Sequence, residues 1–282
     1  MYWLFIFREQ KKQLAAFLSF FQFNLESDNQ SVIWDCDCTL YQLQRFIKEE
    51  AADIIREAVY EGSFLFRYSN FQSWKCKVNA ILKPQTQIRP FLEMPPEKFI
   101  CEDKNLTCPK NCSCYRGAHS LNIFVDCTGL KLIEIPPNLP MPEPGGQLVV
   151  NLAHNSIRQY KNCRDKGYMW LQNVTTLNLE HNEITPNNSD DTDNFLHCLT
   201  SVQYLYIAYN NIEYLPLSIQ YIDYKNLSIS GNKLECDCTT LWLKKWLQKK
   251  NATIQLSQTM HCKGVGKLHV VTLVLNNFIA VI

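Results

Sequence analysis

Apolar residues recur in a fixed pattern between residues 145 and 234. In each copy two apolar residues stand two positions apart, and an asparagine follows three positions later. These asparagines, at positions 155, 182, 210 and 232, are separated by steps of 27, 28 and 22 residues. Alternation of apolar and polar positions over a few residues indicates a short, half-buried strand in each copy. The repeating positions are Val150, Leu152, Asn155 and Ile157; Val174, Leu177, Leu179, Asn182 and Ile184; Val202, Leu205, Ile207, Asn210, Ile212 and Leu215; and Leu227, Ile229, Asn232 and Leu234.

This spacing fits L-x-x-L-x-L-x-x-N-x-I, the signature of leucine-rich repeats. Each L-x-L predicts a strand with two inward side chains, and we expect each asparagine to bond the backbone of neighbouring coils. Every coil leaves apolar faces that only its neighbours can cover, so an array of about four coils needs a cap at each end. We therefore predict an α/β fold, a leucine-rich repeat solenoid with disulfide-rich N- and C-terminal caps.

Cysteine-rich segments flank the repeats, and the first spans residues 34–101. It holds Cys36, Cys38, Cys76 and Cys101, whose spacing alone allows three pairings. Between them, the sequence LQRFIKEEAADIIREAV predicts an amphipathic helix whose charges form a solvated face. Its apolar positions are Leu43, Phe46, Ile47, Ile54, Ile55 and Ala58.

The second cysteine-rich segment, residues 108–140, directly precedes the repeats. It opens with the pattern C-x3-C-x-C-x12-C, formed by Cys108, Cys112, Cys114 and Cys127. A segment this short cannot supply a packed core, so covalent or metal bonds must hold its shape. We expect it to cap one end of the repeats.

The third segment, residues 235–282, follows the repeats and shares the plan of the first. Cys236 and Cys238 precede a short apolar-faced helix, and Cys262 comes later, but a fourth cysteine is missing. We expect this segment to form an incomplete cap at the other end of the repeats.

Two cysteines lie inside the repeats, Cys163 and Cys198, one in each lengthened interval between asparagines. We predict that they form a disulfide that ties the two insertions together. Zinc competes with disulfides as an interpretation of the C-x-C pairs. Structural zinc prefers C-x2–4-C paired with a second such group, whereas the further cysteines here lie well apart along the chain, which favours disulfides.

The composition indicates an extracellular chain. A formal net charge of +1 argues against a nucleic-acid partner, because phosphate binding normally shows as a clustered basic surface. The chain also has thirteen cysteines. Clustered cysteines together with N-x-S/T sequons are typical of chains that pass through the secretory pathway. The glycosylation candidates are Asn29, Asn105, Asn173, Asn187, Asn226 and Asn251; at Asn111 the adjacent Cys112 disfavours modification.

Residues 1–33 form an apolar leader or the remnant of a preceding segment. LAAFLSFFQF could serve as the apolar core of a signal peptide, but REQKK interrupts the stretch and no small-residue cleavage site follows. Both interpretations stay open.

The sequence contains no catalytic motif of the G-x-S-x-G, H-E-x-x-H or P-loop kinds. We therefore predict that the protein is not an enzyme and uses no metal or cofactor. The acidic run 189–193 lacks the glycine and final glutamate of a calcium-binding EF-hand, so we interpret it as a solvated loop.

Two histidines, His154 and His181, occupy the same repeat position, just before the asparagine. We expect their side chains to stack on adjacent coils. A pH-sensitive pair is one interpretation, and two solvent-facing polar residues is the interpretation we favour.

The three cysteine-rich segments resemble known caps of extracellular leucine-rich repeat proteins. C-D-C with two later cysteines resembles the C-terminal cap, and CPKNCSC with a later cysteine resembles the N-terminal cap. Their order around the irregular repeats resembles the membrane-proximal ectodomain of an invertebrate Toll receptor, over residues 34–282. Slit-type guidance proteins also place a C-terminal cap before an N-terminal cap, but the 27- and 28-residue steps favour Toll.

This resemblance implies a set of disulfides and leaves Cys238 without a partner. It also implies a membrane anchor and a cytoplasmic TIR domain beyond this chain, which would place the segment on the extracellular side of the cell membrane. VVTLVLNNFIAVI is too short and interrupted to be that anchor. Because Cys101 closes one cap and Cys108 opens the next, we predict a stiff joint between them. The implied disulfides are Cys36–Cys76, Cys38–Cys101, Cys108–Cys114, Cys112–Cys127 and Cys236–Cys262.

The resemblance further implies a receptor of innate immunity or development that binds a secreted cystine-knot cytokine of the Spätzle kind, forms a homodimer, or both. In this fold the concave strands would carry the binding surface, and exposed tyrosines are common anchors there. A membrane-proximal spacer and a secreted Slit-like adhesion or guidance protein are the alternatives. The side chains expected to point outward are Asn151, Ala153, Asn178, Glu180, Tyr204, Tyr206, Ala208, Tyr209, Ser228 and Ser230, with Asn178, Glu180, Tyr204, Tyr206 and Tyr209 as the binding candidates.

Overall fold

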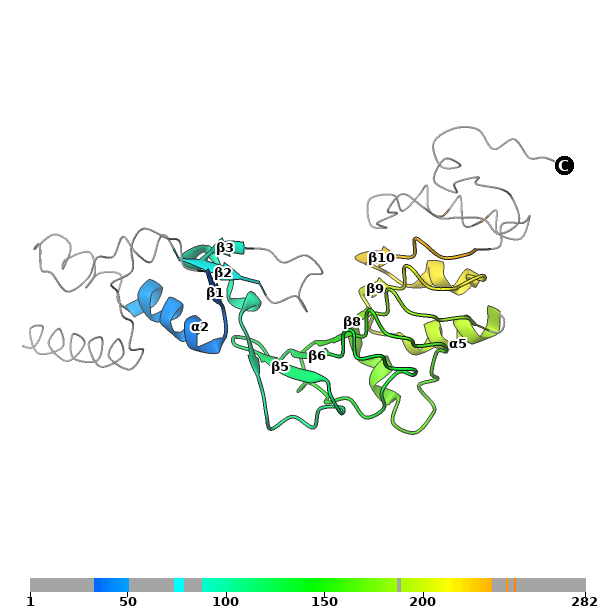
Figure 1. Cartoon of the computed structure of the whole chain (residues 1–282), viewed down its shortest axis with the longest axis horizontal. Helices are drawn as coiled ribbons and strands as arrows, with labels where there is room; N and C mark the ends of the chain where they lie inside the picture. The colour runs from blue at the N-terminus through cyan, green and yellow to red at the C-terminus, as the bar shows by residue number, and fades with distance from the viewer. Residues whose placement is uncertain are drawn as a thin grey trace, which may run out of the picture. The chain divides into compact units, whose positions relative to one another are not determined.

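The computed structural model describes residues 33–50, 74–78, 88–186 and 189–234, together with residues 242 and 246. The chain divides into two compact units (Figure 1). The first comprises Met1–Cys101 and Gly117–His119, and the second comprises Glu102–Arg116 and Ser120–Ile282. The predicted leader, apart from residue 33, and most of the third cysteine-rich segment lie outside the described residues.

The described residues of the first unit form short strands and a helix. β1 pairs in parallel with β2, and β2 pairs in antiparallel fashion with β3. α2 follows β1 and continues into the π-helical turn η1. The elements are β1 (Ile33–Asp35), α2 (Cys38–Arg45), η1 (Phe46–Glu50), β2 (Lys75–Lys77), β3 (Ile88–Pro90), and the 3-10 turns η3 (Phe91–Glu93) and η4 (Pro96–Lys98); β4 (Ile100–Glu102) leads along the chain into the second unit.

The helix of the first unit begins earlier than its apolar spacing predicted. Asp37 is its N-cap, because one carboxylate oxygen accepts hydrogen bonds from the backbone N–H groups of Thr39, at 2.9 Å, and Leu40, at 3.1 Å. Leu43 and Ile47 are buried, as the amphipathic pattern predicted. The predicted positions Ile54, Ile55 and Ala58 lie outside the described residues.

Aromatic and apolar side chains make the core of the first unit. The buried amide of Gln44 supports this core, since its Nε2 donates to the carbonyls of Phe91, at 2.6 Å, and Met94, at 2.9 Å. The loop 117–119 belongs to the same unit, where the hydroxyl of Tyr41 lies 2.8 Å from Nδ1 of His119. The core residues include Leu40, Leu43, Ile47, Trp74, Phe91, Met94 and Phe99.

The second unit is a leucine-rich repeat solenoid, as predicted. β5 pairs in antiparallel fashion with β6, and β6 to β10 follow in parallel, one strand per coil. In Figure 1, β8, β9 and β10 lie one above the next. The inward residues Val125, Val150, Leu177, Leu205 and Leu227 are in register and fully buried. The strands are β5 (Ser113–Gly117), β6 (Ile123–Asp126), β7 (Leu148–Asn151), β8 (Val174–Asn178), β9 (Tyr204–Tyr206) and β10 (Asn226–Ser228).

The repeat asparagines join each coil to the coil before it, which confirms their predicted role. The side-chain oxygen of Asn182 accepts from the N–H of Ile157 at 3.0 Å, and its Nδ2 donates to the carbonyl of Leu152 at 3.0 Å. Asn155, Asn210 and Asn232 make equivalent bonds. These buried bonds satisfy backbone groups that a short strand leaves unpaired.

The lengthened repeat intervals carry helical segments on the side of the coils away from the strands (Figure 1). These are η5 (Met169–Gln172) and α5 (Ser189–Cys198). A further 3-10 turn, η6 (Leu217–Tyr221), lies in the shorter interval before the last strand. The prediction of a solvated loop over 189–193 is therefore wrong. Asp190 and Asp191 lie in the first turn of α5, where acidic side chains favour a helix, and Phe195, which follows, is buried in the core.

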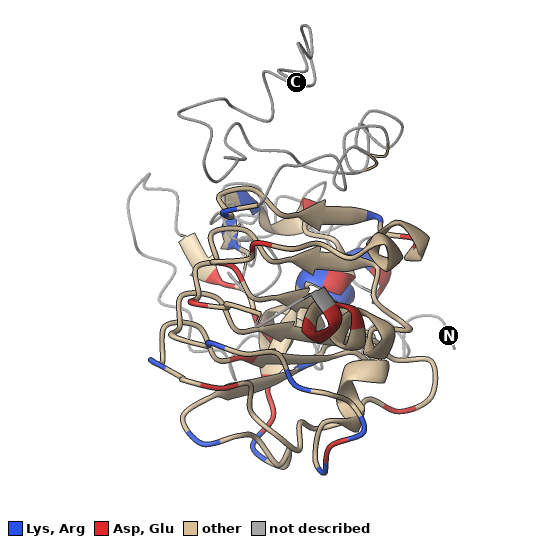
Figure 2. Cartoon of the chain, turned by 90° about the vertical axis from the view of Figure 1, so that its right-hand side faces the viewer, with Lys and Arg blue, Asp and Glu red and all other residues tan. Residues whose placement is uncertain are grey.

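Charged side chains of both signs are interspersed along the coils (Figure 2). Within the described ranges, no helix is long and apolar enough to cross a membrane. The same residues contain no group of three or more His, Cys, Asp or Glu side chains placed to hold a metal ion.

Candidate protein-interaction surface

The outer face of the second-unit sheet carries two rows of side chains, fixed by the strand register. One row runs through Thr176, Tyr204 and Asn226, and the other through Asn178, Tyr206 and Ser228. On β9, the tyrosines flank the buried Leu205 and are themselves half-buried. The two predicted anchors on β9 therefore lie on the same face of one strand, with their rings partly open to solvent.

Glu180 links this face across a coil. One of its carboxylate oxygens accepts a hydrogen bond from the Ser228 hydroxyl at 2.6 Å, although β9 lies between their coils. Burial, together with the negative charge of Glu180 and the neighbouring Tyr204, raises the pKa of Tyr206. Glu180 and the two tyrosines thus form one polar and aromatic group.

Asn178, another binding candidate, organises its own turn. Its side-chain oxygen accepts from the N–H of Glu180 at 2.9 Å. Asn151 bonds the N–H of Ala153 in the same way at 3.2 Å, one coil earlier. An asparagine that bonds the backbone two residues on stabilises a turn, so the structure gives Asn178 a local role in addition to its place on the face.

Four positions that were expected to point outward are buried. Ala153, Ala208, Ser228 and Ser230 are each less than 9% exposed. The chain turns immediately after three of them, because the residue that follows has a left-handed backbone. The left-handed residue ends the extended strand there, so the alternating pattern of the strand no longer predicts which side chains are exposed.

Three stacked rings line the edge of the sheet where these turns lie. The ring centroids of His154 and His181 are 4.4 Å apart with a 9° angle between planes, which confirms the predicted stack. Tyr209 extends the stack at 4.4 Å and 8°. Beyond it lies Gly231, where a Cβ atom would come within 2.5 Å of the Tyr209 ring. The tyrosine was missed as part of the stack, although it occupies the same repeat position as the histidines.

Five of the predicted cysteine pairs form disulfides in the structure. The Cα–Cα distances lie between 4.5 and 5.8 Å, within the range of disulfides. Cys236, Cys238 and Cys262 lie outside the described residues. The pairs are Cys36–Cys76, Cys38–Cys101, Cys108–Cys114, Cys112–Cys127 and Cys163–Cys198.

The predicted glycosylation positions differ in their surroundings. Asn105 is exposed and follows a turn in which Asp103 accepts from its N–H at 3.0 Å. Asn173 is exposed at the end of η5. Asn226 is half-buried on β10, and its side-chain oxygen is shielded from solvent. Asn29, Asn187 and Asn251 lie outside the described residues.

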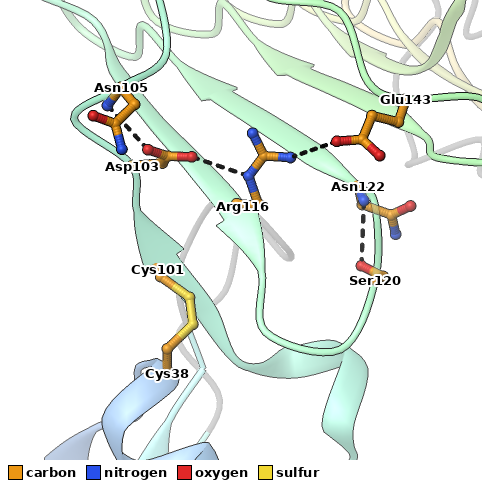
Figure 3. Close-up of polar contacts among 8 residues, drawn as sticks. All are labelled: Cys38, Cys101, Asp103, Asn105, Arg116, Ser120, Asn122 and Glu143. Carbon is orange, nitrogen blue, oxygen red and sulfur yellow. Dashed lines mark hydrogen bonds and ion pairs between the residues drawn. A yellow bond between two sulfur atoms is a disulfide. The ribbon is translucent and has the colours of Figure 1, made fainter.

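An ion-pair network fixes the turn before Asn105 (Figure 3). Arg116 Nε lies 2.9 Å from Asp103 Oδ2, and Arg116 Nη1 lies 3.9 Å from Glu143 Oε1. The hydrogen bond from Arg116 lowers the pKa of Asp103, and the bond from the Asn105 backbone adds to this effect. The network therefore orders the segment that presents Asn105.

No protein-family model matches the chain. Protein toll of Drosophila melanogaster is 24% identical over 235 residues, which cover 80% of this chain and 20% of that protein. Protein halfway of Drosophila pseudoobscura pseudoobscura is 25% identical over 146 residues, covering 50% of this chain and 23% of the relative. Leucine-rich repeat-containing protein 3 of Danio rerio is 30% identical over 135 residues, which cover 48% of this chain and 46% of that protein.

Two solved structures of the Drosophila Toll–Spätzle complex match the fold. The glycosylated form gives a TM-score of 0.53 at 20% identity over 81% of this chain and 28% of the matched chain. The other form gives a TM-score of 0.53 at 21% identity over 84% of this chain and 28% of the matched chain. The chain is similar to the leucine-rich repeat ectodomain of Toll. This Toll-like chain spans 20 to 46% of the length of the relatives described above.

Proposed function

We propose that this chain is the extracellular part of a Toll-like signalling receptor, which binds a secreted protein ligand, mediates receptor dimerisation, or both. The observation that carries the proposal is the grouping of Tyr204, Tyr206 and Glu180 on the outer face of the sheet. The ligand that the resemblance suggests is a cystine-knot cytokine of the Spätzle kind, since Spätzle accompanies Toll in the matched structures. The relatives described above favour this function over a Slit-like adhesion protein.

The chemistry of the face suits a protein partner. Tyrosine provides a large rigid contact area with one polar atom, and it is enriched among the residues that dominate interface energies. The tyrosines of β9 are surrounded by the uncharged side chains of Thr176, Asn178 and Asn226. The only charge in the group, on Glu180, already has a hydroxyl partner. A partner would therefore bury aromatic surface without leaving a new charge unpaired.

The domain arrangement forms part of the same proposal. Residues 34–101 would be a C-terminal-type cap, 108–140 an N-terminal-type cap, 145–234 the repeats and 235–282 a second C-terminal-type cap. The division of the chain at Cys101 and Glu102 supports this arrangement. The protein would be located at the cell membrane with these segments outside, and the stiff joint between the first two caps stays a prediction.

Substitution of the β9 tyrosines tests the proposed function. Binding of a Spätzle-type cytokine from the same organism is measured by surface plasmon resonance, and self-association by sedimentation velocity. The double variant Tyr204→Thr, Tyr206→Thr keeps strand-forming residues and is expected to weaken one of these associations by about tenfold or more, as hot-spot residues do.

Tyr221→Thr is the matched control, because Tyr221 is 77% exposed on η6 and lies off the strand face. It is expected to leave both associations unchanged. The proposal is overturned if the unaltered chain shows neither association, or if the double variant associates as strongly as the control.

A further inference from the structure

The ring stack at the edge of the sheet is held in place by the solenoid itself. The backbone N–H of His154 donates to the carbonyl of Glu180 at 3.0 Å, and that of His181 donates to Ala208 at 3.1 Å. The residues of the stack have φ angles of 57°, 55° and 54°, a region that non-glycine residues seldom adopt. The coils therefore fix the bases of these side chains side by side, and the rings can separate only by changing rotamer.

The stack is bounded at both ends by glycine. Gly129 occupies the equivalent position in the coil before His154, since its N–H donates to the carbonyl of Ala153 at 3.1 Å. Gly231 occupies it after Tyr209, and both glycines have the same left-handed backbone. The two imidazoles and one phenol thus form a closed set with no further ring on either side.

Two neutral imidazoles can stack on each other, but two protonated imidazoles in the same stack repel each other, which costs free energy. At 4.4 Å between ring centroids, two positive charges repel each other, and the repulsion grows where water is partly excluded. Burial lowers the pKa of His181, the charge of His154 lowers it further, and Glu180 opposes both effects. The net shift is downward, so the folded chain favours an uncharged His181.

Other charged groups near the stack are already paired. The Glu180 carboxylate that faces His181 accepts the hydrogen bond from Ser228 at 2.6 Å. Arg158 and Glu183, which follow the two histidines along their coils, pair with each other at 3.2 Å. Tyr209 adds a ring whose hydroxyl does not ionise in mildly acidic solution. Among the described residues, Glu180 is the carboxylate whose charge acts on His181.

We propose that the His154–His181–Tyr209 stack is an acid-sensitive latch, closed at neutral pH and loosened when both histidines are protonated. This inference concerns conformation and does not rest on the receptor function. A secreted or cell-surface protein meets such a change when it enters an acidified compartment. Opening would move the rings apart by a change of rotamer and uncover Gly231, on which Tyr209 lies.

The sign of the effect follows from the shift of His181. Its pKa is lower in the folded chain than in the unfolded chain, so the unfolded chain binds more protons below its ordinary value near 6.5. The stability that uncharged His181 contributes is complete above pH 6.5. It is lost as the pH falls from 6.5 toward the lower pKa of His181 in the folded chain.

The test compares the melting temperature of the full chain at pH 7.5 and pH 5.0. His181→Tyr keeps a ring at the position, as Tyr209 does one coil later, and removes the titration. The unaltered chain is expected to lose a few degrees more than this variant between the two pH values, on the order of 2–4 °C for a chain of this size. His197→Gln is the matched control, because His197 is exposed on α5, and it should behave like the unaltered chain.

Titration of the histidine side chains by nuclear magnetic resonance gives a readout that a purely structural role would not move. His181 is expected to titrate below its ordinary midpoint, because burial and the charge of His154 both lower its pKa. The latch is overturned if His181 titrates at or above its ordinary midpoint, or if His181→Tyr melts with the same pH dependence as the unaltered chain.

Discussion

The first unit and the repeat coils of the second unit both consist of short strands, but different bonds stabilise them. In the first unit, strands of three residues are joined by Cys36–Cys76, and the start of α2 is bonded through Cys38–Cys101. In the coils, one buried apolar column and the asparagine bonds repeat from strand to strand. A covalent bond matters most where no neighbouring copy can supply the same contacts.

Removal of one disulfide from each region should separate the two modes of stabilisation, and we expect the largest effect here. The pairs Cys36–Cys76 and Cys163–Cys198 close chain segments of similar length, with separations of 40 and 35 residues. Chain-entropy arguments give each about 4 kcal/mol. Replacing both cysteines of the first pair by alanine should abolish hydrogen-exchange protection in β1, β2 and α2.

The same replacement at Cys163 and Cys198 should expose α5 to exchange while β7 to β10 stay protected, because the coils keep their own bonds. Peptide-level exchange measured by mass spectrometry distinguishes the outcomes. Simultaneous loss of protection in α5 and all four strands would show that the coils depend on their disulfide as the first unit does.

The asparagine bonds give the next largest effect. Asn182→Ala leaves the N–H of Ile157 without its partner. It also removes one of two hydrogen bonds from each of the carbonyls of Leu152 and Leu179, which Asn155 and Asn210 still bond. A buried backbone group without a partner costs about 1–3 kcal/mol, and each other lost hydrogen bond costs about 1 kcal/mol, so we expect a total near 3 kcal/mol in denaturant unfolding. Asn178→Ala is the matched control, because its side chain bonds only its own turn, and about 1 kcal/mol is expected there.

The first-unit counterpart is Gln44→Ala, which removes two bonds to carbonyls. Exchange in this variant should rise only within the first unit, whereas Asn182→Ala should raise exchange in the coils on both sides of it. An effect of Asn182→Ala confined to its own coil would contradict the view that neighbouring coils stabilise one another.

The smallest effect is expected where the second unit begins. Asp103→Asn breaks the ion pair with Arg116 (Figure 3), which is partly exposed and therefore weak. Since the pKa of Asp103 is lowered from 3.8, its contribution is present above that pH and is lost as the pH falls further. Melting curves should show a small difference between variant and unaltered chain at pH 7 that vanishes near pH 2. A difference that persists in acid would assign the stabilisation to packing and not to charge.

The features predicted correctly from the sequence are those that repeat at a fixed spacing. The register of Val150, Leu177 and Leu205, and the stack of His154 on His181, follow once the asparagines are aligned, because equivalent positions lie side by side in a solenoid. The cysteine pairs came from the resemblance to known caps, and the residues alone left three pairings open in the first segment.

The features missed are those that depend on local backbone geometry or on packing by an insertion. Ala153 and Ala208 are buried at positions just before a left-handed residue, where alternation along a strand no longer predicts which side chains are exposed. The helix over 189–198 was not predicted, because its acidic first residues were interpreted as a solvated loop. Acidic residues also favour the N-terminus of a helix. The start of α2 at Cys38 could have been predicted from Asp37, which is a preferred N-cap residue.

The asparagine bonds also determine how such a chain can vary. The steps between asparagines range from 22 to 28 residues, yet each asparagine keeps bonds near 3.0 Å to the preceding coil. Insertions can therefore accumulate behind the strands, as α5 and its disulfide have done, without altering the spacing of the front. The two surfaces of the solenoid are free to evolve separately, so that descendants could acquire a new contact on one while keeping an old contact on the other.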